Sequence, residues 1–158
     1  CTAYPDAHGN NKPITFFSSD GRTWDGSGPP HPAVASEIVA LAGYPDYAAA
    51  DINGVNVMLR EDGRYRMYFS DFHHFGKTYR ASSDDGRRFK LDGTVLDGAV
   101  LDGALMVNDV KKFEVAGVDW YLMGLHHNGD QIFYSLSKDG MKFPPAKELA
   151  AHGGTSDR

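Results

Sequence analysis

Two aspartates have the residue type and the placement for acid–base chemistry at a shared site. Asp51 precedes a β-rich run in the middle of the chain, and Asp109 precedes the corresponding run further along. Two carboxyl groups that flank one bond can act as general acid and general base, provided that burial or a like charge keeps one of them protonated near neutral pH. The alternative is that each aspartate caps a strand or accepts a hydrogen bond from a loop amide.

Histidines occur at a regular spacing around these aspartates. His8, His73 and His127 each lie ten residues before the serine of a motif Ser-x-Asp-Gly-x-x-(Trp/Phe), and His74 and His126 adjoin two of them. Neutral imidazole both donates and accepts hydrogen bonds, so we expect these side chains to line a pocket rim and to bind the hydroxyl groups of a sugar. Solvated loop histidines are the alternative interpretation.

The motif itself is a repeat that predicts how these residues are positioned. Its copies begin at Ser18, Ser83 and Ser137, and each follows a β-rich run. Asp-Gly favours a tight turn with positive φ, and the Ser and Asp side chains can accept hydrogen bonds from the N–H groups of that turn. An aromatic residue closes each copy, and we expect it to open the next strand and fill the gap between sheets: Trp24, Phe89 and Phe143.

The repeat predicts an all-β fold built from β-propeller blades of four antiparallel strands. Ser18 and Ser83 are 65 residues apart (83 − 18), and Ser83 and Ser137 are 54 apart (137 − 83), which suits one blade per copy. About two and a half blades form one partial domain over residues 1–158: 1–30 end a blade, 50–100 and 105–150 are full blades, and 151–158 start another. The segment Ala33–Leu41 is interpreted as a short helix or a loop.

An incomplete propeller has consequences for association. A closed ring needs roughly four blades or more, so the chain is expected to be either a fragment or one half of a five-bladed ring. Open sheet edges favour pairing with another chain. We therefore expect a homo-oligomer or a complementing chain that completes the ring.

The runs Asp51–Ser70 and Asn108–Lys111, together with the repeated turns, resemble the five-bladed propeller glycoside hydrolases, the arabinanase/β-xylosidase and invertase/levansucrase superfamily. The resemblance implies hydrolysis of glycosidic bonds by carboxylates at the starts of inner strands, with Asp51 matching the second-blade acid and Asp109 the third-blade acid. Asp109 stands where that superfamily usually has Glu, and the first-blade acid would lie before Cys1. The resemblance also implies an extracellular or periplasmic protein. The alternative is a non-catalytic carbohydrate-binding or self-associating module with an incomplete acid set.

Aromatic residues near these positions could supply surfaces on which a sugar ring stacks. Tyr44 and Tyr47 lie in the loop before Asp51, where we expect a pocket wall, and Phe72 and Phe75 surround the histidine pair of the middle repeat. Trp120 lies inside a β-rich run and is interpreted as core packing.

Other ligand classes find little support in the sequence. A net charge of −5 argues against nucleic acid, and no apolar run reaches the ~18 residues of a membrane span. Phosphate-binding glycine loops, Cys/His zinc spacings and serine-hydrolase elbows are absent from the sequence, so no cofactor is expected. Tandem Leu-Asp-Gly pentapeptides over residues 91–105 leave calcium as an alternative, if the chain turns at each Asp-Gly.

Overall fold

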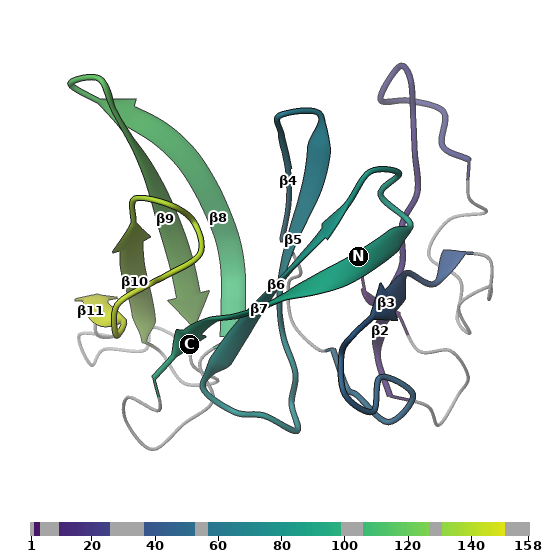
Figure 1. Ribbon diagram of the computed structural model, residues 1–158, viewed down its shortest axis with the longest axis horizontal. Coiled ribbons are helices and arrows are strands. Elements are labelled where there is room, and N and C mark those ends of the chain that lie inside the picture. The colour runs from purple at the N-terminus through teal and green to yellow at the C-terminus, as the bar shows by residue number, and fades with distance from the viewer. Residues whose placement is uncertain are drawn as a thin grey trace, which may run out of the picture.

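The computed structural model describes residues 2–3, 10–25, 37–52, 57–98, 106–126 and 131–150. These residues form β-strands, turns and loops without an α-helix, which confirms the all-β prediction (Figure 1). In this part of the chain no helix is long and apolar enough to cross a membrane. The strands assemble into two main sheets and a two-stranded ribbon, and neither main sheet closes on itself.

The first main sheet, here called the central sheet, contains β3 to β7 in the order β3-β7-β6-β5-β4. Four of its strands form an antiparallel meander: β4 (Val57–Glu61), β5 (Arg64–Ser70), β6 (Lys77–Ser83) and β7 (Arg88–Asp97). β3 (Ala40–Ala42) adds to β7 as a parallel edge strand. The helical interpretation of Ala33–Leu41 is therefore wrong at the end of that segment, where Val39 and Leu41 are buried and Ala40 is exposed in an extended chain.

The second main sheet, here called the distal sheet, is a four-stranded antiparallel meander. Its strands are β8 (Met106–Val115), β9 (Val118–His126), β10 (Ile132–Ser137) and β11 (Lys147–Ala150). A bulge interrupts the β8–β9 pairing between Val107 and Asp109. The ribbon pairs β1 (Thr2–Ala3) with β2 (Lys12–Pro13), and the chain after β2 binds residues 37–39 through backbone hydrogen bonds.

All three Ser-x-Asp-Gly turns have one hydrogen-bonding pattern. The amide of Gly86 donates to Ser83 Oγ at 2.9 Å, and the amides of Arg87 and Arg88 donate to Asp85 Oδ1 at 2.9 and 2.8 Å. The turns at Ser18 and Ser137 repeat these bonds. Their glycines have φ between 65° and 73°, as the sequence predicts: Gly21, Gly86 and Gly140.

The aromatic residues that close these turns differ in burial. Phe89 is 2 % exposed and Phe143 is 7 % exposed, so both fill gaps in the core as expected. The same prediction is wrong for Trp24, which is 55 % exposed. The difference arises because Phe143 packs against Tyr68 of the central sheet, whereas no described residue covers Trp24 in the corresponding way.

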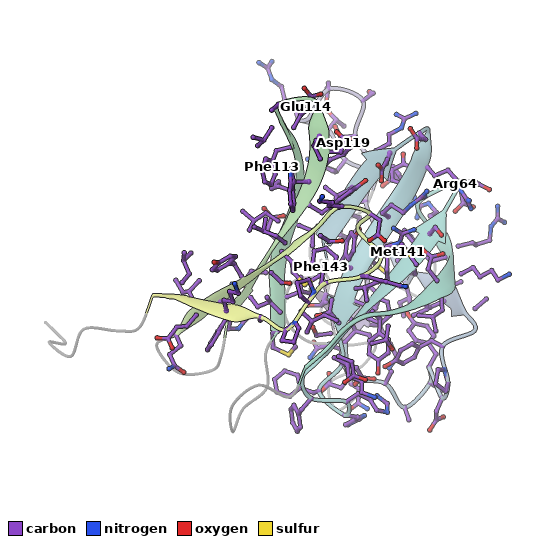
Figure 2. The ribbon with its side chains drawn as sticks, turned by 60° about the vertical axis from the view of Figure 1, so that its left-hand side comes forward. Arg64, Phe113, Glu114, Asp119, Met141 and Phe143 are labelled. Atoms are coloured by element: carbon purple, nitrogen blue, oxygen red, sulfur yellow. The ribbon has the colours of Figure 1, made fainter. Side chains whose placement is uncertain are left out.

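The main sheets lie side by side and share a core (Figure 1). Tyr68 on β5 is fully buried, donates its hydroxyl to the Gly140 carbonyl at 3.0 Å and meets the Phe143 ring edge-on at 6.2 Å. Figure 2 shows Phe143 in the interior between the two sheets. A second core, which includes Phe69 and Phe89, lies on the opposite side of the central sheet.

Candidate functional site

A buried carboxylate, Asp71, lies at the end of β5 and organises a polar cluster. Its side chain is 1 % exposed. Oδ1 accepts hydrogen bonds from the amides of His73 at 2.9 Å and Asp51 at 3.1 Å, and Oδ2 accepts one from the Tyr44 hydroxyl at 2.7 Å. The His74 ring lies with Nδ1 3.3 Å from Oδ2. Burial would raise the pKa of Asp71, but these hydrogen bonds outweigh it and lower the pKa, so the group is charged at neutral pH.

Asp51 adjoins Asp71 through the backbone and binds a second segment through its side chain. Asp51 Oδ1 accepts the Asn11 amide at 2.9 Å and Asn11 Nδ2 at 3.1 Å. The Asp51 carbonyl accepts the amide of Phe72 at 2.9 Å, so two hydrogen bonds tie the start of the loop after β5 to Asp51. Asp51 lies at the end of the central sheet opposite the Ser83 turn, where Arg64 and Asp84 form an ion pair.

Lys12 places a positive charge beside the two aspartates. It is 6 % exposed, and Nζ donates to the Ala50 carbonyl and lies 5.5 Å from the centre of the Tyr47 ring. Burial lowers the pKa of Lys12, while Asp51 and Asp71 act in the opposite direction. The cluster thus combines two carboxylates with one buried ammonium group, which limits the electrostatic cost of burying either aspartate.

The two predicted wall residues, Tyr44 and Tyr47, are held inside this cluster. Tyr44 is 6 % exposed and meets the rings of Phe69 and Tyr79 edge-on at 5.5 and 5.1 Å. Burial and the neighbouring Asp71 raise the pKa of its hydroxyl, so it remains a donor to that carboxylate. Tyr47 donates its hydroxyl to the Val39 carbonyl at 2.7 Å. Both tyrosines therefore pack within the cluster and hold its polar groups in place.

The loop between β5 and β6 presents an exposed rim above Asp71. The side chains of His73 and His74 are 53 % and 47 % exposed, and Phe75 is 59 % exposed. Phe72 meets Phe75 edge-on with ring centres 5.8 Å apart. This rim places two imidazoles and an apolar ring on one short, anchored loop, which is a combination of polar and apolar groups suited to a small polar ligand.

Other predicted site residues are not brought into this cluster. Asp109 lies on β8 with a side chain that is 46 % exposed, and its Oδ2 lies 3.0 Å from Lys111 Nζ. His126 ends β9, and its buried Nδ1 has no hydrogen-bond partner among the described residues. His8 and His127 lie outside the described residues. The structure thus gathers Asp51, Tyr44, Tyr47, His73 and His74 and links none of them to Asp109 by a contact among the residues it describes.

The described part of the chain shows no group of three or more metal-ligating side chains. Of the pentapeptides considered for calcium, residues 91–97 belong to β7 and 99–105 lie outside the described residues. Asp92, within this region, accepts Arg80 Nε at 2.8 Å and Ser82 Oγ at 2.5 Å and so contributes to the sheet.

Sequence reasoning missed Asp71, Asn11 and Lys12, which complete the cluster. The signal for Asp71 was its position directly after the buried end of β5, where a carboxylate in an apolar run needs several donors. The signal for Asn11 and Lys12 was weaker, because they bind Asp51 and Ala50 from a segment about forty residues away in sequence.

No protein-family profile, curated protein or solved structure matches this chain. The geometry of the cluster and its rim therefore carries the functional argument.

Proposed function

We propose that this protein binds carbohydrate at the loop between β5 and β6, with the Asp51–Asp71 cluster as its rigid base. The observation that carries this proposal is the exposed rim of His73, His74 and Phe75 fixed to a fully buried carboxylate. Sugar hydroxyls need donors and acceptors, which imidazoles supply, and the apolar face of a sugar ring packs on an aromatic side chain.

Anchoring of the loop supports binding over a purely solvated role for these histidines. The His73 amide and the His74 ring both contact Asp71, and the Phe72 amide donates to the Asp51 carbonyl. A loop held at several points loses little conformational freedom when a ligand binds, which favours affinity.

Hydrolysis in the manner of the five-bladed propeller glycoside hydrolases is the second candidate. The presence of Asp51 and Asp71 around Lys12 favours it, since two carboxyl groups at one site are a requirement of that chemistry. The same chemistry needs a carboxyl group that is protonated near neutral pH. Asp71 has a lowered pKa and would serve to position or stabilise charge, so the acid would have to come from elsewhere. In this proposal the two main sheets are consecutive propeller blades.

Binding is tested by titrating the chain with a panel of neutral and acidic oligosaccharides by calorimetry. The double variant His73→Ala/His74→Ala and the variant Phe75→Ala should each weaken binding by about tenfold or more. Lys90→Ala, at an exposed position on β7, is the matched control and should leave the Kd unchanged. Equal affinity in all four proteins would contradict the proposed rim.

Hydrolysis is tested separately with aryl glycosides between pH 4 and pH 8. Turnover by the wild-type chain that is lost in Asp51→Asn would establish a catalytic role for that carboxylate. Binding without turnover at any pH in that range would assign the chain to the non-catalytic class.

A further inference from the structure

An apolar face of the distal sheet is exposed to solvent. Along β9 the side chains of Tyr121, Met123 and Leu125 point into the shared core, and the alternate residues point away from it. Cross-strand pairing places Phe113 beside Trp120 and Leu136 beside Leu122 on that outer side. Figure 2 shows Phe113 on the β8–β9 hairpin, away from the interior position of Phe143. That side also carries Lys111, which pairs with Leu122. We call its apolar residues the distal face: Phe113, Trp120, Leu122, Ile132 and Leu136.

The distal face is apolar and its residues lack the burial of core positions. Leu122 and Phe113 are each 38 % exposed, and Ile132 is 49 % exposed. Large apolar side chains that gather on one side of a sheet are unusual for a surface that contacts only water. The side chain of Lys138 lies above Trp120, with Nζ 5.2 Å from the ring centre, and covers part of this face.

The equivalent face of the central sheet is covered. The motif serines of the two sheets are 54 residues apart (137 − 83), so Leu122 corresponds to Tyr68 and Phe113 to Leu59. Tyr68 is fully buried beneath the Ser137 turn, where it binds the Gly140 carbonyl and contacts Phe143, and Leu59 packs against the same core. At the junction of the two main sheets, therefore, this face of the central sheet receives the Ser-x-Asp-Gly turn and the closing aromatic residue of the distal sheet.

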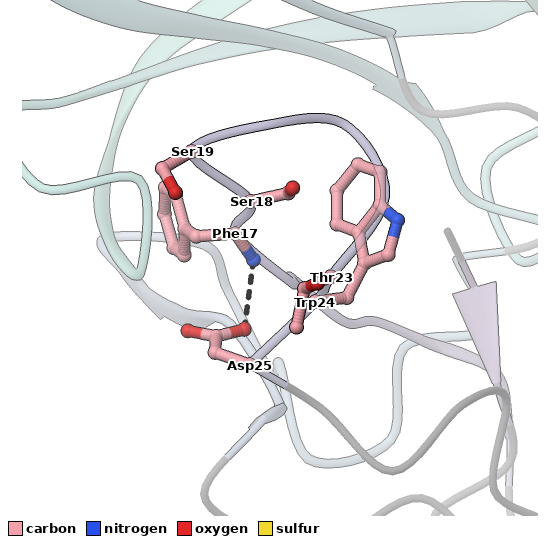
Figure 3. Close-up of a pocket in the computed structure, with 6 residues that line it drawn as sticks. All are labelled: Phe17, Ser18, Ser19, Thr23, Trp24 and Asp25. Atoms are coloured by element: carbon pink, nitrogen blue, oxygen red, sulfur yellow. Dashed lines mark hydrogen bonds between the residues drawn. The ribbon is translucent and has the colours of Figure 1, made fainter.

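The turn at Ser18 has the same construction and an uncovered aromatic residue. It keeps the hydrogen bonds of the other two turns, yet Trp24 is 55 % exposed where Phe89 and Phe143 are buried. Figure 3 shows Trp24 and Thr23 at one side of a pocket of about 460 Å³, which Phe17, Ser18, Ser19 and Asp25 complete. Asp25 closes the base of the turn through Phe17, whose amide donates to Oδ1 at 2.8 Å.

We propose that the distal face of one copy of this chain binds the Trp24 turn of a second copy, head to tail. The indole of Trp24 packs on Leu122 of the other copy, as Phe143 packs on Tyr68 within the chain. A second copy is the occupant because this chain carries both halves of the contact, each left exposed by the described residues and each equivalent to a half that is buried at the junction of its two main sheets. Such a contact is heterologous, so copies join into a ring or an open row.

The mass of the full chain in solution, measured by sedimentation velocity from about 1 to 200 μM, tests the association. We expect a weight-average mass that rises above the monomer mass with concentration. Trp24→Ala and Leu122→Asp should each raise the apparent Kd by at least about tenfold. Phe75→Ala, at an exposed aromatic residue of the central sheet, should leave it unchanged.

Mixing the two variants tests the head-to-tail geometry. Trp24→Ala retains an intact distal face and Leu122→Asp retains an intact Trp24 turn, so an equimolar mixture should form dimers that neither variant forms alone. Ile132→Asp, at the same face, replaces Leu122→Asp if that variant has an altered circular dichroism spectrum. A wild-type chain that stays monomeric, association that survives Trp24→Ala, or a mixture that fails to form dimers would each overturn the proposal.

Discussion

The carboxylate of Asp71 accepts three hydrogen bonds from His73, Asp51 and Tyr44 while it is 1 % exposed. Asp71→Asn removes the charge and replaces one acceptor oxygen by an amide that itself donates. At least one buried donor then loses its partner, so we expect the free energy of unfolding to fall by about 1–3 kcal/mol. The midpoint of urea denaturation measures this loss.

Asp97→Asn is the matched control, because Asp97 is 65 % exposed and lies 3.6 Å from Lys77 Nζ in a surface ion pair. Its effect should stay within about 0.5 kcal/mol. Equal urea midpoints for the two variants would show that the Asp71 network contributes little to stability.

Single residues differ in how far the sequence predicted their roles. The spacing of the Ser-x-Asp-Gly motif led to the prediction that His73 and His74 line a pocket rim. The structure places both on the loop between β5 and β6. The contact between Asn11 and Asp51 depends on how the first segment folds back on the sheet, and local pattern does not encode that. Burial of Asp71 likewise depends on Tyr44, which is 27 residues earlier in sequence.

The turns that follow β6 and β10 make close contacts with neighbouring segments. A Cβ atom added at Gly140 would lie 2.8 Å from Tyr68 Oη and 3.0 Å from the Tyr121 ring, whereas one added at Gly117 would meet nothing within 4 Å. Both glycines have positive φ, so alanine is strained at either position by about 1 kcal/mol. Gly140→Ala should therefore destabilise the protein by about 1–3 kcal/mol more than Gly117→Ala.

Thermal denaturation of the two glycine variants, read by circular dichroism, measures the difference. A Tm for Gly140→Ala that equals that of Gly117→Ala would mean that the turn does not press on Tyr68 and Tyr121.

The aspartates of the three turns predict how the protein responds to acid. Backbone amides of Thr23 and Arg22 lower the pKa of Asp20 to about 2, and equivalent amides lower the pKa of Asp85 and Asp139. An unfolded Asp has a pKa of about 3.9, so these turns stabilise the folded state above that pH. Their contribution is lost as the pH falls from about 4 towards 2.

Urea midpoints recorded between pH 7 and pH 2.5 test the acid response. Asp85→Asn keeps an acceptor oxygen and cannot titrate, so its midpoint should fall less steeply below pH 4 than that of the wild-type chain. Parallel curves for the two proteins would contradict a contribution from this turn.

The sequence predicted those strands whose pattern lies within one short stretch of the chain. The four strands β4 to β7 lie within residues 50–100, where the repeat predicted four antiparallel strands. β3 was not predicted, since three residues of a parallel edge strand leave only the short pattern of buried Leu41 between exposed Ala40 and Ala42. Such a strand exists because β7 offers its free edge, which is a tertiary effect.

One core joins the two main sheets. Tyr68, Val95 and Leu96 contribute to it from the central sheet, and Met123 and Phe143 are among the residues that contribute from the distal sheet. Glu61 adds a polar contact across the same junction, because it accepts hydrogen bonds from the Tyr121 hydroxyl and, at 3.2 Å, from Lys112 Nζ. The sequence predicted the two meanders, but not which side chains would join them.

Because the core is shared, we expect the two sheets to unfold as one cooperative unit. Phe143→Ala removes a buried ring from the junction and should lower the free energy of unfolding by about 3–5 kcal/mol, against less than about 0.5 kcal/mol for the exposed Phe75→Ala. Amide hydrogen exchange should show equal loss of protection in β5 and β9, since both strands face Phe143 through Tyr68 and the shared core. Loss confined to β9 would mean that the central sheet is stable without its neighbour, and the junction would then be a contact between two independent units.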